Sequence, residues 1–276
     1  MNIIIVGSSY GIGKELAKQY FSQLTNENKG GSLTLIARDT KALNELRNEL
    51  NQNNNQSKTV RIIVAGIDVT KQEEFTDFLQ NAVKQQKTDL FIYCAGVYSP
   101  NNLANIDLKI ANQTIAINLT ALASALSIII PQMKTQKSGQ IALFGSVAGY
   151  RGLPNSGFYG ATKAAIINLA ETLYIELKPY NIGVSLINPG FVKTRLTDLN
   201  NFKMPCLISA NEASNYIIKG INQRDFEIHF PKKFTLLMKL IKILPNKVFF
   251  KLSTKLLKNN IKELEIYIDE LKTILN

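Results

Sequence analysis

The chain has 276 residues, 45% of them hydrophobic, and can therefore bury the core of one α/β domain with some additional helices. Two cysteines give no disulfide framework, and the first apolar run is too short for a signal peptide or a membrane span, so we expect a cytoplasmic protein. The net charge of +11 comes without the interleaved basic and aromatic residues of a nucleic-acid-binding surface, so we expect no nucleic-acid partner.

Short β-rich runs alternate with longer amphipathic segments along the chain. The predicted strands are Asn2–Val6, Ser32–Ala37, Val60–Ala65, Asp89–Cys94, Gln140–Phe144, Gly183–Asn188 and Phe226–Phe230. The predicted helices are Lys14–Leu24, Ala42–Leu50, Gln72–Lys84, Leu108–Met133 and Thr162–Leu177. This alternation predicts an α/β fold, a Rossmann-like doubly wound parallel sheet with helices on both faces, over residues 1–230. A helical C-terminal extension is expected over 231–276.

The first predicted strand runs directly into a glycine-rich turn, "GSSYGIG", and then into a helix. Gly7, Gly11 and Gly13 have no Cβ, so the backbone can approach a pyrophosphate closely, and the start of the helix offers free N–H groups to it. A glycine-rich turn can also be purely structural. Its position between a strand and a helix favours dinucleotide binding.

Further motifs follow in a fixed order: "GIDVT" (66–70), "YCAG" (93–96), "INL" (117–119), "GSVAG" (145–149), "YGATK" (159–163) and "NPGFVKT" (188–194). Together with the glycine-rich turn, this series resembles the short-chain dehydrogenase/reductase family over about residues 1–230. The chain departs from the family pattern at Val6, where Thr is usual, and at Tyr93 and Cys94, which replace the asparagines of N-N-A-G. These departures concern the support of the cofactor turn more than the chemistry.

The resemblance implies a catalytic set of Asn118, Ser146, Tyr159 and Lys163. Tyr159 and Lys163 are four residues apart and share one face of a helix, so the ammonium group is expected to lower the tyrosine pKa toward the working range. Ser146 would bind the substrate carbonyl oxygen, and Asn118 would connect Lys163 to solvent. His229, the only histidine, has no second histidine or cysteine nearby, and no metal site is expected.

The resemblance also implies the residues that contact the cofactor: Gly7, Ser9, Gly11, Ile12, Gly13, Arg38, Asp68, Val69, Ala95, Gly96, Tyr159, Lys163, Pro189, Gly190, Val192 and Thr194. Arg38 follows the second strand, and Ala37 stands where NAD-dependent members carry an acid. An arginine there suits a 2′-phosphate, so NADP(H) is expected in preference to NAD(H). Asp39 is expected to cap the next helix instead.

The segment 195–209, where the family usually carries its substrate loop, is largely apolar. We therefore expect an NADP(H)-dependent oxidoreductase that interconverts a carbonyl and an alcohol on a hydrophobic substrate. The alternative is a non-catalytic NADP-binding sensor or regulator on the same fold, against which the complete catalytic set argues. Apolar faces on the helices 108–133 and 154–178 predict a homodimer or homotetramer.

The C-terminal extension is strongly basic, since 231–258 contains eight lysines and no acidic residue. In 234–244 the polar residues Thr235, Lys239 and Lys242 form one stripe among apolar residues. After Pro245 a second polar stripe lies opposite an apolar face. The stripe consists of Lys247, Lys251, Thr254, Lys255 and Lys258. The apolar face consists of Val248, Phe249, Leu252 and Leu256. These patterns suit a peripheral membrane contact through 231–258. Packing on the protein is the alternative, and the repeat Ile261, Leu264, Ile268, Leu271, Leu275 resembles a packing seam.

Overall fold

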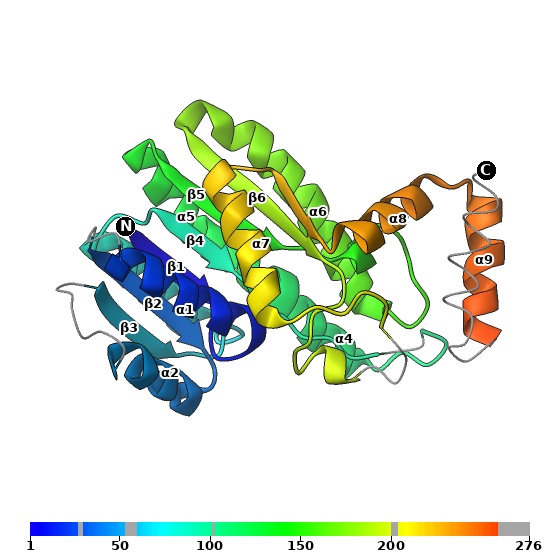
Figure 1. Cartoon of the computed structure of the whole chain (residues 1–276), viewed down its shortest axis with the longest axis horizontal. Coiled ribbons are helices and arrows are strands. Elements are labelled where there is room, and N and C mark those ends of the chain that lie inside the picture. The colour runs from blue at the N-terminus through cyan, green and yellow to red at the C-terminus, as the bar shows by residue number, and fades with distance from the viewer. Residues whose placement is uncertain (27–29, 53–59, 101–102, 200–203, 259–276) are drawn as a thin grey trace.

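The computed structural model describes residues 1–26, 30–52, 60–100, 103–199 and 204–258. Seven strands form one parallel sheet in the order β3-β2-β1-β4-β5-β6-β7 (Figure 1). The strands are β1 (Asn2–Val6), β2 (Gly31–Ala37), β3 (Val60–Gly66), β4 (Leu90–Tyr93), β5 (Gly139–Phe144), β6 (Ile182–Pro189) and β7 (Glu227–Phe230). The predicted doubly wound parallel sheet is confirmed, with strand ends within one residue of the predicted ones.

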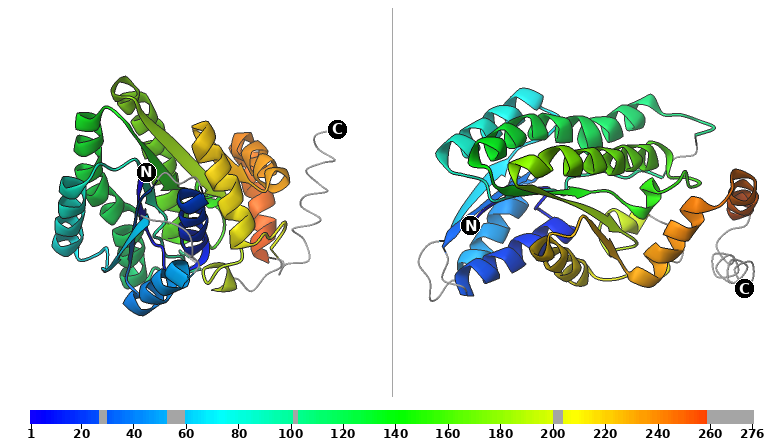
Figure 2. Two further views of the ribbon diagram at one scale, coloured as in Figure 1. Left: turned by 60° about the vertical axis from the view of Figure 1, so that its left-hand side comes forward. Right: turned by 90° about the horizontal axis from the view of Figure 1, so that it is seen from above.

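The helices are α1 (Gly11–Asn26), α2 (Thr40–Gln52), α3 (Gln72–Gln85), α4 (Leu108–Ile115), α5 (Ala121–Gln136), α6 (Gly157–Leu177), α7 (Ala210–Gln223), α8 (Lys232–Ile243) and α9 (Asn246–Lys258). Helices α1, α2 and α7 share one hydrophobic core with one face of the sheet. Helices α3, α5 and α6 share a second core with the opposite face. The two helical layers are visible on either side of the sheet in Figure 2.

The strand order reverses between β1 and β4: the first three strands are added toward one edge of the sheet and the later strands toward the other. Strand β1 pairs with β2 on one side and with β4 on the other, in parallel register. In open α/β sheets, ligands bind at the carboxyl ends of the strands where the strand order reverses. The loops that follow β1 to β6 meet at this edge and carry the predicted residues outside helices. Asn118 lies in the π-helical turn between α4 and α5, and Tyr159 and Lys163 lie on α6.

The segment predicted as one helix, 108–133, is interrupted. A π-helical turn, Ala116–Thr120, separates α4 from α5 and contains Asn118. Leu108–Gln136 is long and apolar enough to cross a membrane by length and composition, but half of it is buried inside the protein, as in a core helix. Regular sequence periodicity gives no signal for such a turn, because a single inserted residue hardly changes the pattern.

Helices α8 and α9 extend from the end of β7 to one end of the molecule (Figure 2). Phe234, Met238 and Ile241 of α8, with Phe249 and Leu252 of α9, join the core that α3, α5 and α6 share with the sheet. The C-terminal segment therefore packs on the body of the fold through α8 and through Phe249 and Leu252 of α9. The predicted seam at 261–275 lies outside the described residues.

The polar stripe of Thr235, Lys239 and Lys242 on α8 faces largely toward the protein. Thr235 is fully buried and contacts His229, and Lys239 pairs with Glu227 of β7. Two of its three members thus face the protein, because β7 offers them partners that the sequence of α8 alone does not reveal. On α9 the prediction agrees better, since Lys247, Lys251 and Thr254 are exposed.

Candidate active site

The glycine-rich turn forms a tight cradle between β1 and α1. Gly7 has a φ of +90°, and a Cβ there would lie 2.5 Å from the backbone nitrogen of Ala95. A Cβ on Gly13 would lie 2.1 Å from the carbonyl oxygen of Gly7. Both positions therefore require glycine, and α1 begins within the turn, at Gly11. Ser9 lies within the turn, and Ile12 packs on the core beneath it.

The expected catalytic serine, tyrosine and lysine come together at the ends of β5 and α6. Ser146 follows β5 in extended conformation and its Oγ accepts from the Ala148 N–H at 3.1 Å. The side chains of Ser146 and Tyr159 are hydrogen-bonded. Lys163, one helical turn after Tyr159, places its Nζ 5.5 Å from the centre of the tyrosine ring and donates to the Phe144 carbonyl at 2.7 Å.

Burial controls the protonation of this pair. Desolvation raises the pKa of Tyr159 to about 12, although the bond with Ser146 lowers it. The expected net lowering of the Tyr159 pKa toward the working range is therefore wrong for this structure, because desolvation outweighs the interactions that favour the phenolate. Desolvation also lowers the pKa of Lys163 to about 8. Tyr159 is thus a neutral phenol near neutral pH, the form that donates a proton.

Asn118 is fully buried in the π-helical turn and bonds to the backbone of Val97 in both directions. Its Oδ1 accepts from the Val97 N–H at 2.8 Å, and its Nδ2 donates to the Val97 carbonyl at 3.1 Å. Nδ2 also lies 3.1 Å from the hydroxyl of Thr162, next to Lys163 in sequence. A Cβ on Gly96 would contact both Asn118 Oδ1 and Lys163 Nζ, so the loop after β4 separates these two groups.

The two departures from the N-N-A-G pattern have structural partners. The Tyr93 hydroxyl donates to the carbonyl of Ile117 at 2.7 Å, inside the π-helical turn and beside Asn118. The Cys94 thiol accepts a hydrogen bond from the backbone of Gly13. Both residues therefore support the loops around the site, and burial raises the pKa of the Cys94 thiol to about 12.

The loop after β2 carries the predicted discriminator of the cofactor. Arg38 is exposed next to the glycine-rich turn, whose Gly7 N–H donates to the Ile36 carbonyl at 2.8 Å. Asp39 accepts from the Ala42 N–H at 3.0 Å, so the expectation that it caps α2 is confirmed.

Asp68 and Val69 lie after β3 at the same edge. Asp68 Oδ1 accepts from the N–H and the hydroxyl of Thr70. Partial burial opposes ionisation of this carboxyl, but the bonds from Thr70 and the charge of Arg38 outweigh it and lower its pKa. Val69 is buried in the core behind it.

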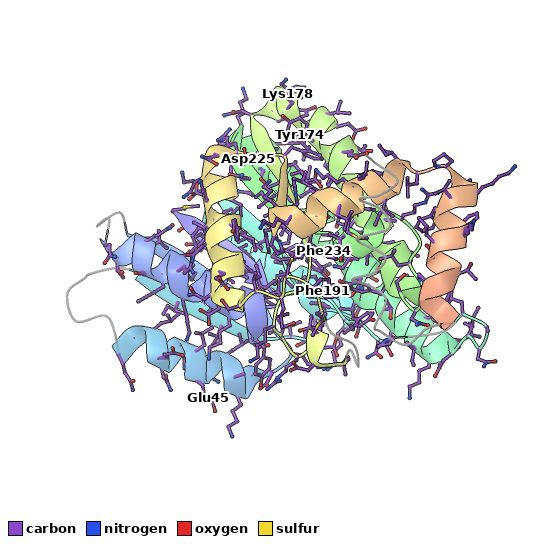
Figure 3. All side chains as sticks on the ribbon, turned by 45° about the vertical axis from the view of Figure 1, so that its right-hand side comes forward. Glu45, Tyr174, Lys178, Phe191, Asp225 and Phe234 are labelled. Atoms are coloured by element: carbon purple, nitrogen blue, oxygen red, sulfur yellow. The ribbon has the colours of Figure 1, made fainter. Side chains whose placement is uncertain are left out.

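The segment after β6 closes the far side of the site. The Gly190 N–H donates to the Phe230 carbonyl at 2.7 Å, next to Pro189, and Val192 is buried. Thr194 reaches the glycine-rich turn, because its Cγ2 would lie 3.0 Å from a Cβ on Gly11. Phe191 stacks near Phe234 of α8, with ring centres 5.3 Å apart; the pair is labelled in Figure 3.

Three residues at the site were not predicted from the sequence. The ring of Tyr98 lies 5.0 Å from that of Tyr159, edge to face, and partial burial raises its pKa. The Arg195 guanidinium lies 3.3 Å from the centre of the Tyr10 ring, and Tyr10 donates to Asp39. Because Tyr98 follows the motif "YCAG" by two residues, its position in the sequence could have indicated that it lies at the site.

His229 takes part in a structural network under α8. Its Nδ1 lies 2.6 Å from the Thr235 hydroxyl and its Nε2 lies 3.1 Å from Lys232 Nζ. Burial and the nearby lysines lower its pKa. Among the described residues no group of three or more histidine, cysteine or acidic side chains is placed to hold a metal ion.

Comparison with known proteins agrees with this geometry. The family model described as short chain dehydrogenase matches residues 1–204. An uncharacterized oxidoreductase of Myxococcus xanthus is 31% identical over 247 residues, covering 89% of this chain and 93% of that protein. The 3-ketodihydrosphingosine reductase of Bos taurus is 27% identical over 207 residues, covering 71% of this chain and 59% of that enzyme.

Solved structures share the fold. A short-chain dehydrogenase of Sphingobium yanoikuyae in complex with NADPH superposes with a TM-score of 0.73 at 22% identity, covering 89% of this chain and 96% of that one. A short chain dehydrogenase/reductase of Burkholderia phymatum in complex with NAD gives 0.75 at 23% identity, covering 87% and 92%. The chain belongs to the short chain dehydrogenase family, and it is an NAD(P)-dependent oxidoreductase acting on CH–OH or C=O groups.

Proposed function

We propose that this enzyme is an NADP(H)-dependent reductase that converts a hydrophobic carbonyl compound to an alcohol, with Tyr159 as the proton donor. The observation that carries the proposal is the hydrogen-bonded pair of the buried Ser146 and the partly buried Tyr159, beside the buried Lys163. The cradle of Gly7 and Gly13, which any Cβ would fill, fits the diphosphate of a dinucleotide. The site residues expected to hold the cofactor line the same edge of the sheet.

In this mechanism the chain supplies orientation and a proton. Ser146 and Tyr159 both direct hydroxyl groups to the carbonyl oxygen, and Tyr159 transfers its proton to that oxygen as the C=O bond becomes a C–O single bond. The Lys163 ammonium stabilises the phenolate that remains, and Asn118 holds the adjoining turn. The bound cofactor supplies the hydride for the carbonyl carbon.

The substrate class rests on the lining of the site. Leu196, Leu199 and Leu207 of the segment after β6 are exposed by 36%, 54% and 42%. The sequence of this segment, 195–209, contains no cluster of like charges to bind an ionic substrate. The bovine relative is named for a ketone, 3-ketodihydrosphingosine. We therefore favour ketones with long apolar chains over small polar ones.

Replacing the proton donor tests the catalytic proposal. Tyr159→Phe removes the hydroxyl and keeps the ring, so NADPH binding should change little while ketone-dependent NADPH oxidation falls by at least about 100-fold. Turnover is measured by absorbance over ketones of increasing chain length. Tyr174→Phe, on the exposed side of the same helix, is the matched control and should retain full activity. Equal turnover by Tyr159→Phe and the wild type would overturn the mechanism, and NADPH binding without turnover of any ketone would favour a sensor.

Arg38 should determine the choice of cofactor. Arg38→Ala removes a charged hydrogen bond to the 2′-phosphate of NADPH, and we expect its affinity for NADPH to fall by about 2 kcal/mol while that for NADH hardly changes. Fluorescence titration of both cofactors gives the two dissociation constants. Arg61→Ala, an exposed arginine on β3, is the control. Equal affinity of the wild type for NADPH and NADH would contradict the NADP(H) preference.

A further inference from the structure

The solvent face of α8 carries two large exposed apolar side chains among lysines. Leu236 and Ile243, seven residues apart on one side of the helix, are exposed by 54% and 75%. Lys232 and Lys233, one turn before Leu236, are exposed on the same side. The inward side of α8 is already filled by buried residues such as Met238. A helix that packs an apolar side on the core and exposes a second one has an unsatisfied surface, which commonly marks an interaction site.

The solvent face of α9 is basic with one large aromatic side chain. Lys247, Lys251 and Thr254 are exposed, and Phe250 among them is exposed by 58%. The preceding residue, Phe249, points into the core and is only 2% exposed. Both helices lie at the same end of the molecule in the two views of Figure 2. An exposed apolar side chain surrounded by lysines therefore recurs on each helix.

We propose that these two helices bind the surface of an anionic lipid bilayer. The binding face consists of Lys233, Leu236, Ile243, Lys247, Phe250 and Lys251. Its apolar side chains would enter the boundary between headgroups and acyl chains, and its lysines would lie against anionic headgroups. The segment 231–258 contains no acidic residue that could neutralise these lysines locally.

The charge of this face argues against a second copy of the chain as the occupant. A symmetric dimer places the same surface patch on both subunits. Such a contact would bring the lysines of one subunit against those of the other without any acid from the same segment. Like charges opposed in this way are unfavourable, whereas anionic headgroups complement them.

The face is held in place before any membrane is bound. Arg151, in the loop between Ser146 and Tyr159, donates to the carbonyls of Ile241 and Leu244 at 3.1 and 2.5 Å. At the other side of α8, Lys239 pairs with Glu227. A preformed face loses little conformational entropy on binding, and its attachment to the catalytic loop gives the active site a fixed orientation relative to the bilayer.

Co-sedimentation of the full-length protein with vesicles tests the proposal. We expect binding to phosphatidylserine-containing vesicles at low salt and little binding to pure phosphatidylcholine. One molar salt shortens the screening length to about 3 Å and should release the protein. The triple variant Lys233→Gln, Lys247→Gln, Lys251→Gln should partition roughly 100-fold more weakly. Its matched control replaces three exposed lysines elsewhere by Gln, namely Lys84, Lys137 and Lys219, and should bind at least several-fold more tightly than that variant.

A matched pair of aromatic substitutions isolates the apolar part. Phe250→Ser should reduce vesicle binding at least several-fold, whereas Tyr216→Ser on α7, exposed by 46%, should not. Failure of the wild type to bind anionic vesicles at low salt would overturn the proposal. So would a loss of subunit association in light scattering, or a large loss of thermal stability, on changing Leu236, Ile243 and Phe250 to Ser together, since the face would then be covered by another copy or by this chain's own residues.

Discussion

Lys163 carries an ionisable ammonium group and is almost completely buried, an arrangement that costs folding stability but serves catalysis. Its side chain is 5% exposed, and burial lowers its pKa from 10.5 to about 8. The Phe144 carbonyl accepts one of its three donors. A buried ammonium group near Tyr159 is unfavourable for folding but is the group that stabilises a phenolate.

We therefore expect Lys163→Met to abolish turnover and yet to stabilise the apo enzyme at pH 7. The pKa difference corresponds to on the order of 3 kcal/mol, from which the lost bond to Phe144 subtracts about 1. Between pH 8 and 10.5 the unfolded wild type binds more protons than the folded form, so wild-type stability rises with pH. The advantage of the variant should thus be largest below pH 8 and disappear toward pH 10.5.

Urea unfolding of both proteins at pH 7 and pH 9.5 measures this difference. Lys178→Met, an exposed lysine just after α6, is the control and should change stability little at either pH. If Lys163→Met were less stable than the wild type at pH 7, the ammonium group would be stabilising rather than costly, and our interpretation of its burial would be wrong.

At the scale of elements, one arginine joins the C-terminal helices to the catalytic loop. The Arg151 guanidinium reaches three carbonyls at the end of α8 and the Asn246 side chain at 2.6 Å. It also lies 3.9 Å from the centre of the Phe249 ring on α9. The last carbonyls of a helix have no partner within it, so a fixed cation at this position both satisfies them and favours the helix dipole.

Arg151→Ala should lower the free energy of unfolding by on the order of 2 kcal/mol and speed amide exchange in α8 and α9 first. Arg151→Lys keeps the charge but cannot bond several carbonyls at once, so it should recover only part of the loss. Arg47→Ala on α2 serves as the control. Unchanged exchange in α8 and α9 of Arg151→Ala would show that apolar packing alone holds these helices.

At the scale of the whole molecule, α6 presents an outward face suited to a second subunit. Ala161, Ala164, Asn168 and Ile175 are exposed at helical spacing along it, and Ile175 is exposed by 71%. Small side chains allow two such helices to approach closely, and Ile175 supplies apolar area. We propose a homodimer or homotetramer assembled through this face.

Light scattering at micromolar concentration should give a dimeric or tetrameric mass for the wild type. Ile175→Glu should shift it to a smaller assembly, because a charge would be buried in the contact. Ile243→Glu, at an equally exposed isoleucine on α8, should leave the mass unchanged. A monomeric wild type would contradict the proposed assembly.

Much of the fold could be predicted from the amino-acid sequence, and the resemblance of its motifs to a family supplied most of the candidate site as a proposal. The seven strands, the parallel sheet and the glycine-rich turn depend on local patterns: apolar runs, alternation of elements, and positions where a Cβ does not fit. The Tyr-Lys spacing on α6 is likewise local. Such features were predicted because the information for each lies within a few neighbouring residues.

Only the tertiary structure decided the features that depend on contacts between distant segments. The π-helical turn that holds Asn118 receives a bond from Tyr93, 24 residues away in sequence. Burial, rather than the nearby lysine, sets the pKa of Tyr159. On α8, Glu227 and His229 draw Lys239 and Thr235 inward and leave Leu236 and Ile243 exposed. A helix pattern shows which residues share a side, but the partners on other elements determine which side is buried, and these are known only once the chain has folded.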